Sequence, residues 1–489
     1  MLISIWLSQV LFSGAVAGEN FSPRVPGISL LFRIPLEDVS FYVRAGHLPD
    51  AFLAFSPDGG LLAVGTFLGR LIVTSTKDGR ILWQKRIPEA MVKRVAFSQD
   101  GRTIYFGEQS PDGFIYAVSA TDGHPRWRFR LADDLLPGTP PEKGDIYGIY
   151  RQPGCYRLKV LEDGDLLVLG IHSWPDKKRG YWRRLSRVYR LSPSGRLRWA
   201  WPREGPAELS LIYADSDKKG LRVAVVSTLP SDQLPPEYPY TPGTIYVLDG
   251  QRGKEVGRYR IPPLRPYYDR VSVWESVAVD PQGEFAVVAT SDGRGFIIDL
   301  KKIKPSKILA LGTPIMVGGL PVSAMSSYSL ISPRREIYFQ TDTSSIPYGL
   351  NVSGNRPAGP HPNANTIWAV NPRGHILWRF SAPFRFQGLA SDARGKVLAT
   401  AAGASARGRE ASHQYGVFVF KTTRPGGGLE KLIGYYPTRG PVFFHLALSP
   451  DGNLLALCET PYLDELGRQI GSYQVHVLKI KGQLKEARR

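Results

Sequence analysis

The sequence is poor in the residues that build metal and redox sites. Of its 489 residues, two are cysteine and eight are histidine. There is no CxxC or CxxCH pattern, which excludes covalent haem and cysteine-based zinc sites. HExxH and the GxSxG nucleophile turn are also missing, and the three-glycine turn at 426–428 lacks the Lys-Ser/Thr of a phosphate-binding loop. We therefore predict no metal site and no catalytic residue.

Acidic residues are also few. Asp and Glu number 43 against 62 Lys and Arg, which gives a formal net charge of +19. Such a charge attracts anionic partners, including acidic proteins, lipid head groups, glycans and nucleic acid. Because the charge is spread along the chain, a generally basic surface accounts for it equally well.

Long apolar runs are missing after the start of the chain. Residues 2–16 form a short apolar stretch, and Ala15-Val16-Ala17 has the small residues of a cleavage site. A membrane span needs about 20 apolar residues. We expect residues 1–17 to be a signal peptide and the mature chain to be periplasmic or secreted, without a transmembrane segment. Since no Lys or Arg precedes the stretch, an uncleaved anchor is the alternative.

The chain contains an internal repeat: an apolar strand, a tight turn rich in Pro, Asp and Gly, and a second apolar strand. AFLAFSPDGGLLAVG is typical of it. The eight copies start at Ala51, Arg94, Tyr156, Leu209, Ser276, Ser327, Gly388 and His445. They lie roughly 45 to 65 residues apart, which is the spacing of propeller blades.

A second hairpin follows each copy. It consists of an aliphatic strand, a Gly turn and a strand with an aromatic residue, as in LIVTSTKDGRILWQKRI. Two hairpins give each unit four antiparallel strands, and such a sheet repeated around a channel is a β-propeller. We predict an all-β, eight-bladed β-propeller of four-stranded antiparallel blades, formed as a single domain by residues 18–489.

The two ends of the chain indicate how the ring closes. The last unit, 442–480, has three strands, whereas residues 28–36 (ISLLFRIPL) form an orphan strand. Docking this strand onto the last blade completes the ring and removes an exposed edge. The same topology places Cys155 near the third blade and Cys458 in the eighth, farther apart than the roughly 7 Å that a disulfide allows. We predict two free thiols, with Cys458 buried.

Four blades carry Gly-x-x-x-Trp, with the pairs Gly79/Trp83, Gly123/Trp127, Gly195/Trp199 and Gly374/Trp378. This pattern resembles the PQQ-like propeller repeat, and the SPDG hairpins resemble the WD40-like repeats of bacterial propellers. The resemblance implies eight blades. It also implies that Trp83, Trp127, Trp199 and Trp378 dock adjacent blades, which is a structural role and not a ligand site.

Strand order assigns the connections to two faces. The first-to-second and third-to-fourth connections share a face of tight turns, and the remaining connections form the opposite, loop-rich face. Seven of those are long: 132–154, 172–185, 229–242, 262–270, 342–365, 403–414 and 460–472. Long loops on a rigid scaffold are where binding residues usually lie, so we expect this face to be functional.

Basic and aromatic residues concentrate in these loops. Exposed aromatic residues and arginines are typical anchors of protein interfaces. The candidates for partner binding are Trp174, Lys177, Lys178, Arg179, Trp182, Arg183, Arg184, Tyr238, Tyr240, Tyr267, Tyr268, Arg270 and Tyr348. The alternatives are a solvated basic loop and aromatic residues that pack the loops onto the propeller.

The leading hypothesis is a non-catalytic exported scaffold that binds an acidic or envelope-associated protein, and not nucleic acid, through the loop-rich face. It resembles the propeller scaffold of outer-membrane protein assembly, although no lipid-attachment cysteine follows the apolar stretch. The alternative is a quinoprotein-like oxidoreductase with PQQ and calcium as cofactors. Against it, the chain has no adjacent cysteines. A lyase or hydrolase of polyanionic glycans is a third reading.

Overall fold

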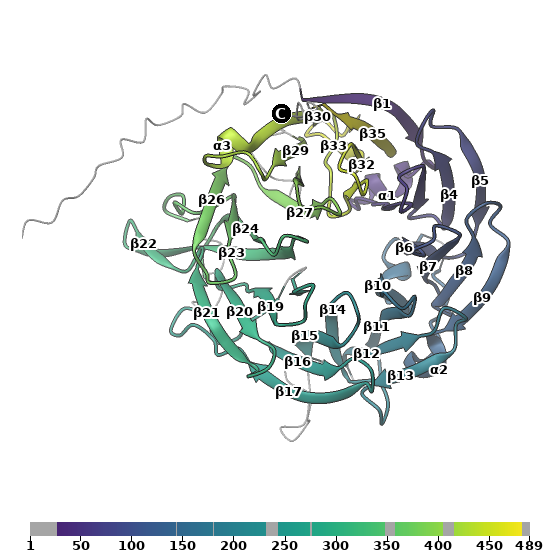
Figure 1. The fold of residues 1–489 in the computed structure, drawn as a ribbon, viewed down its shortest axis with the longest axis horizontal. Coiled ribbons are helices and arrows are strands. Elements are labelled where there is room, and N and C mark those ends of the chain that lie inside the picture. Colours follow the sequence, from purple (N-terminus) through teal and green to yellow (C-terminus); the bar gives the residue numbers. More distant parts are fainter. Residues whose placement is uncertain are drawn as a thin grey trace, which may run out of the picture.

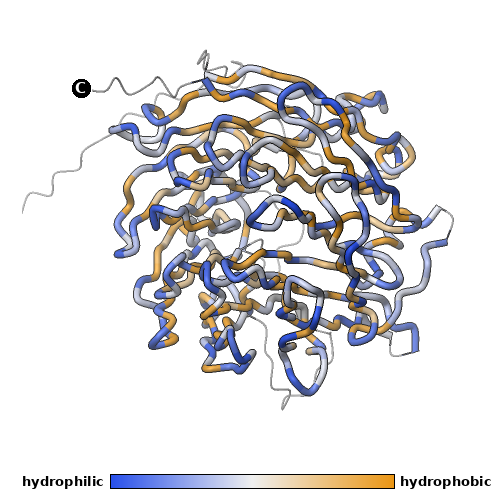
Figure 2. The backbone as a smooth tube through the Cα atoms, turned by 45° about the vertical axis from the view of Figure 1, so that its right-hand side comes forward, coloured by the Kyte–Doolittle hydropathy of each residue, from blue (hydrophilic) through white to orange (hydrophobic). Residues whose placement is uncertain are grey.

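The computed structural model describes residues 27–142, 144–178, 180–230, 243–273, 276–347, 357–403 and 415–481. The predicted signal peptide lies outside the described residues. The structure is all-β, and its antiparallel sheets follow one another around a ring (Figure 1). Apolar residues run along the strands and polar residues gather at the turns between them (Figure 2).

Tight turns join the strands because the turn residues satisfy the backbone locally. In the SPDG turn after β2, Asp58 Oδ1 accepts the hydrogen bond of the Gly60 N–H at 2.9 Å, and the Ser56 N–H donates to Leu61 O at 3.0 Å. Gly59 lies in the left-handed region with φ +74°, which favours glycine.

The first part of the ring contains a four-stranded sheet and an eight-stranded sheet that combines two units through the pairing of Gly154 with Gln109. The four strands are β2 (Phe52–Phe55), β3 (Leu61–Gly65), β4 (Arg70–Ser75) and β5 (Ile81–Arg86). The eight are β6 (Met91–Phe97), β7 (Thr103–Gln109), β8 (Phe114–Ser119), β9 (Pro125–Arg130), β10 (Gly154–Val160), β11 (Leu166–Asp176), β12 (Tyr181–Leu191) and β13 (Leu197–Trp201). Helix α2 (Ala132–Leu135) and the 3-10 turn η1 (Gly148–Arg151) lie between β9 and β10.

Two four-stranded sheets and a five-stranded sheet follow. The first contains β14 (Leu209–Ser216), β15 (Arg222–Pro230), β16 (Thr244–Asp249) and β17 (Lys254–Arg260). The second contains β18 (Ala278–Val279), β19 (Phe285–Ala289), β20 (Arg294–Asp299) and β21 (Lys304–Ala310). The five-stranded sheet contains β22 (Ile315–Val317), β23 (Leu320–Ile331), β24 (Ile337–Ser345), β25 (Thr366–Val370) and β26 (Ile376–Ser381). The short β22 pairs with β23 as an extra hairpin.

The last sheets contain β27 (Phe386–Ser391), β28 (Val397–Ala402), β29 (Tyr415–Lys421) and β30 (Leu432–Thr438), with helix α3 (Gly428–Lys431), and then β31 (Ala447–Leu448), β32 (Leu454–Glu459) and β35 (Gln474–Ile480). The small hairpin of β33 (Tyr462–Leu463) and β34 (Gln469–Ile470) precedes β35, and helix α1 (Ser40–Arg44) precedes β2. The N-terminal strand β1 (Ile28–Pro35) pairs antiparallel with β35, so segments from both ends of the chain share one sheet. We interpret each four-strand unit as one blade. The number of blades, eight, stays a prediction.

The hydrophobic core lies between neighbouring sheets. One cluster joins Ile34 and Val477 of the last sheet to Leu62 and Ile72 of the sheet that follows it around the ring. Strands in the middle of the sheets, such as β19, are buried along their whole length, which explains why their sequences are continuously apolar. Both cysteines are free and Cys458 is buried, as predicted, and Cys155 is buried as well.

Candidate functional site

The hairpin of β11 and β12 is a long extension of the loop-rich face. Each strand has 11 residues, and they pair without interruption from Leu166–Leu191 to Asp176–Tyr181. The prediction of a loop at 172–185 was therefore wrong for most of its length, because residues 172–176 pair with residues 181–185 in a β-ladder. Arg187 of β12 forms an ion pair of 2.8 Å with Asp134 of α2, which fixes the neighbouring loop to the hairpin.

Side chains alternate between the two faces of this hairpin. Trp174 lies opposite Arg183 in the register, whereas Trp182 lies opposite Pro175. Trp174 packs against His172 in a tilted arrangement with ring centroids 4.2 Å apart, and the Arg183 guanidinium lies 5.2 Å from the Trp174 ring centroid. The two tryptophans therefore face in opposite directions.

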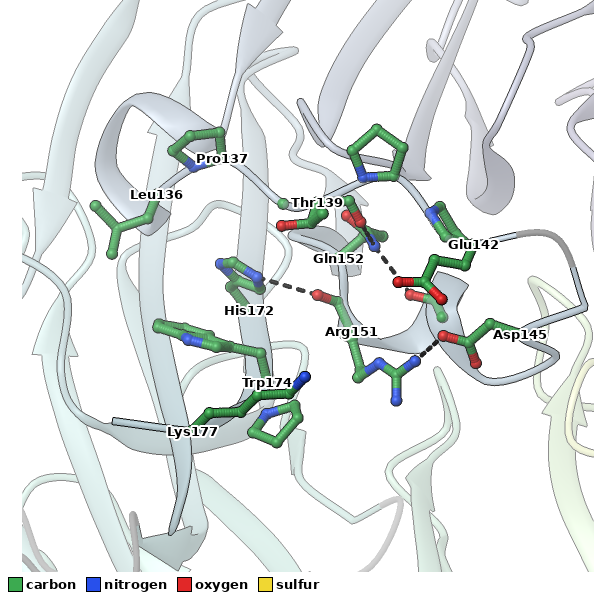
Figure 3. A pocket seen from close by; sticks show the side chains of 15 residues that line it. Leu136, Pro137, Thr139, Glu142, Asp145, Arg151, Gln152, His172, Trp174 and Lys177 are labelled. Carbon is green, nitrogen blue, oxygen red and sulfur yellow. Dashed lines mark hydrogen bonds and ion pairs between the residues drawn. The ribbon is translucent and has the colours of Figure 1, made fainter. Parts of the chain in front are cut away.

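A pocket of about 520 Å³ lies between this hairpin and the loop 136–152 (Figure 3). One wall carries His172, Trp174 and Lys177, and the other carries a proline-rich segment with Glu142 and Asp145. Buried Gln152 holds the two limbs of the loop together, since its Nε2 donates to Thr139 O at 2.5 Å and to Gly148 O at 3.0 Å. The pocket wall is thus preorganised.

Two of the charged side chains that line the pocket compensate each other. Asp145 forms an ion pair with Arg151. The ring nitrogens of His172 contact Leu135 O at 2.8 Å and Arg151 O at 3.1 Å. Burial lowers the pKa of His172 and outweighs these two carbonyl contacts, so the ring is neutral at pH 7 and positions the loop.

A second pocket, of about 300 Å³, lies on the other side of the same loop. The two pockets share Pro141, Glu142 and Asp145. The second is lined mainly by apolar side chains, including Phe41 of α1 and Phe67. Beside it, His47 contacts the Tyr150 hydroxyl at 2.8 Å, and burial lowers the pKa of His47 to about 4. The two pockets form a continuous surface across the first three blades.

Polar and apolar side chains together line the two pockets. Their walls contain prolines, aromatic rings and aliphatic side chains, and the first pocket also carries Glu142, Asp145, Arg151 and Lys177. Among the described residues, no group of three or more His, Cys, Asp or Glu side chains is placed to hold a metal ion. That the chain acts without cofactor or metal remains a prediction.

The structure brings some of the predicted contact residues together. Trp174, Lys177, Lys178, Trp182, Arg183 and Arg184 all lie on the β11–β12 hairpin. Tyr267 and Arg270 lie elsewhere, between β17 and β18. Arg179, Tyr238, Tyr240 and Tyr348 lie outside the described residues.

Tyr268 is not a surface contact. Its side chain is 1% exposed, and its hydroxyl lies 2.8 Å from Ser323 Oγ. A ring this buried packs the connection onto the propeller and contributes nothing to an external surface, so its assignment as a binding residue was wrong.

The tryptophans of the Gly-x-x-x-Trp pattern lie between adjacent sheets. Trp83 Nε1 donates to Ala120 O, Trp127 Nε1 to Pro193 O, and Trp199 Nε1 to Gly250 O, each at 2.8 Å and each in the next unit of the ring. Trp378 stacks on Phe420 of the following sheet with centroids 5.6 Å apart. These positions are structural.

Sequence reasoning missed several exposed apolar residues around the two pockets. Phe41, Leu136 and Tyr147 are all exposed there. A signal for the pocket wall was present in the proline-rich run PGTPP at 137–141. The α1 residues carried no such signal in the sequence, because their exposure depends on how the helix packs beside Phe67.

Within the described part of the chain, no helix has the length and apolar character needed to cross a membrane. A search of curated proteins found no match. The family model described as outer membrane protein assembly factor BamB matches residues 43–143.

Similar solved structures are propellers. The Dos1 propeller has a TM-score of 0.52 at 11% identity, with 94% of this chain and 98% of that chain covered. The C-terminal WD40 domain of Sif2 has a TM-score of 0.51 at 13% identity, covering 93% and 99%. BamB from Moraxella catarrhalis has a TM-score of 0.48 at 14% identity, covering 92% and 99%.

At these identities the structural matches establish the fold alone. The propeller arrangement of the sheets, the repeat pattern and the partial family match agree with one another. The chain therefore folds as a β-propeller, and its residues 43–143 match a family model of a PQQ-like repeat protein.

Proposed function

We propose that this protein is an exported, non-catalytic propeller scaffold that binds a protein partner through the surface formed by the two pockets and the β11–β12 hairpin. The observation that carries the proposal is the continuity of these pockets across one preorganised loop, with exposed Phe41, Leu136 and Tyr147 around them. Aromatic anchors beside desolvated pockets are the usual source of binding energy in protein interfaces.

The family match supports the same role. Residues 43–143 include Phe67 and Ala90 of the second pocket and Leu136 and Pro141 of the first. The family that matches this segment is described as an outer membrane protein assembly factor. A partner in the cell envelope, and a periplasmic or secreted location, follow from the proposal together with the apolar segment at residues 2–16.

Site-specific photo-crosslinking tests the proposal. A photoreactive phenylalanine replaces Tyr147, and a matched control carries it at Leu197, which is exposed to a similar extent (51% and 49%) but lies on the outer strand β13. In intact envelopes we expect a discrete crosslinked protein from position 147 and none from position 197. The crosslink should weaken when Leu136→Ala is added. Identical products from both positions, or no product from position 147, would overturn the proposal.

A further inference from the structure

The face of tight turns, opposite the proposed docking surface, also has a pocket. It measures about 530 Å³ and lies between the turns of two adjacent blades. Its walls are formed by Leu221 and Arg222 after β14, by Asp249, Gln251 and Arg252 in the turn after β16, and by Gln282 and Gly283 after β18. Its volume lies in the range of small-molecule sites.

A buried arginine fixes two of these turns to each other. The Arg190 side chain, 2% exposed, donates from Nη1 to Gly220 O at 3.0 Å and to Gly250 O at 2.7 Å. Its Nε donates to Asp165 Oδ2 at 2.8 Å, and Trp199 Nε1 donates to Gly250 O as well. The turns that carry Arg222 and Arg252 are therefore held rigidly, as a preorganised site requires.

The pocket offers two guanidinium groups to a ligand. Among the described residues, neither Arg222 nor Arg252 forms an ion pair with a carboxylate, and Arg222 Nη1 donates only a long hydrogen bond of 3.5 Å to Leu221 O. Gln282 Oε1 accepts a hydrogen bond from Arg335 Nη1 at 2.6 Å, which leaves its amide N–H groups to donate. The planar donor geometry of a guanidinium group matches a carboxylate or a phosphate.

Asp249 adds an acceptor to this basic pocket. Its Oδ1 accepts the backbone N–H groups of Gln251 and Arg252, both at 3.0 Å, which leaves Oδ2 to accept further hydrogen bonds. A carboxylate repels a bare anion, but it accepts a hydrogen bond from a hydroxyl group. The arrangement therefore calls for a ligand with both an anionic group and hydroxyl groups.

We propose that this pocket binds an acidic saccharide, with the sugar's carboxylate or phosphate at Arg222 and Arg252 and its hydroxyl groups at Asp249 and Gln251. The proposal does not depend on the docking surface, since the two sites lie on opposite faces.

Titration of the full chain with glucuronate, glucose 6-phosphate, glucose and inorganic phosphate tests it. We expect at least one of the two acidic sugars to bind more tightly than both glucose and inorganic phosphate; which one binds distinguishes a carboxylate from a phosphate site. Arg222→Gln combined with Arg252→Gln should weaken that binding at least about tenfold, since hydrogen bonds to charged groups are the strong ones. Arg222→Gln combined with Arg260→Gln, a matched variant of equal charge with one arginine outside the pocket, should weaken it less.

Asp249→Asn keeps the turn, because an asparagine oxygen accepts the same backbone hydrogen bonds. It should weaken binding of the acidic sugar but not of inorganic phosphate. Failure of both acidic sugars to bind, equal binding of glucose, or equal binding of inorganic phosphate that is insensitive to Asp249→Asn would overturn the proposal. An equal loss in the two double variants would also overturn it.

Discussion

At the scale of single residues, contact between adjacent blades depends on a turn glycine and the large side chain that covers it. Gly123 has φ +73°, and a Cβ there would lie 2.9 Å from the Trp83 ring. Gly253 and Trp199 repeat this contact. Where the ring closes, Phe32 of β1 takes the place of the tryptophan over Gly79. The Gly-x-x-x-Trp pattern identified the tryptophans. It could not identify Phe32, because Phe32 is not part of that pattern.

The contact at Trp199 leads to a stability prediction. Trp199→Ala should lower the free energy of unfolding by about 3–5 kcal/mol, because a large buried side chain and its packing are lost. Urea unfolding followed by circular dichroism measures the change. The control, Leu197→Ala at an exposed position of the same strand, should stay within about 0.5 kcal/mol. Equal effects of both variants would contradict a docking role for Trp199.

A buried aspartate in β14 predicts a dependence on pH. Burial alone raises the pKa of Asp215, but the charges of Lys159, 2.8 Å away, and of Arg157 outweigh it and hold this pKa below its usual value. A lowered folded pKa stabilises the protein above the unfolded value, about pH 4, and this contribution is lost as the pH falls further.

Asp215→Asn should therefore destabilise the protein by about 1–3 kcal/mol at pH 7. The difference from the unmodified protein should begin to shrink as the pH falls below about 4, where Asp215 of the unfolded chain takes up a proton, and should shrink further as the folded protein is protonated as well. Denaturant unfolding at pH 7 and pH 3 measures this. A difference that stays constant between the two pH values would contradict the assigned ion pair.

At the scale of elements, the β11–β12 hairpin shows where the sequence misleads. Lys177, Lys178 and Tyr181 have the polarity of a loop, yet Tyr181 begins a strand of 11 residues. The ladder extends because Trp174 and Pro175 have partners across the strands, in Arg183 and Trp182. Each of the eight predicted apolar copies corresponds to a pair of strands, because those strands are specified by local sequence. The extension of the hairpin depends instead on cross-strand pairs.

Shortening this hairpin separates folding from binding. Replacing residues 174–183 with a two-residue turn should change the melting temperature by no more than about 4 °C, because the removed part lies beyond the buried strands. The same variant should lose the crosslink from position 147, since Trp174 and Lys177 of the first pocket are gone. A large drop in melting temperature would show that the hairpin supports the fold.

At the scale of the whole molecule, the ring unites the two ends of the chain. β1 pairs with β35 from Ile28–Ile480 to Pro35–Gln474. Without β1, both the outer edge of β35 and the apolar side chains against Ile34 are exposed. An unpaired strand edge is a template for association.

Truncation tests this contribution. A chain that begins at residue 18 should behave as a monodisperse species in size-exclusion chromatography, because the described fold starts at residue 27. A chain that begins at residue 37 lacks β1 and should aggregate or unfold at a lower temperature. Equal behaviour of the two chains would contradict a closing role for β1.

The repeat, the four-strand units, the separation of the cysteines and the pairing partner of the N-terminal strand could all be predicted from the sequence. These features follow from local periodicity and turn residues, which act within each unit. Tertiary structure decided which side chains of the long connections are exposed, that Trp174 and Trp182 face apart, and that Tyr268 is buried. It also created all three pockets, because each unites segments that the chain order keeps apart. Exposure and convergence depend on how whole blades and their loops pack, and no local pattern encodes them.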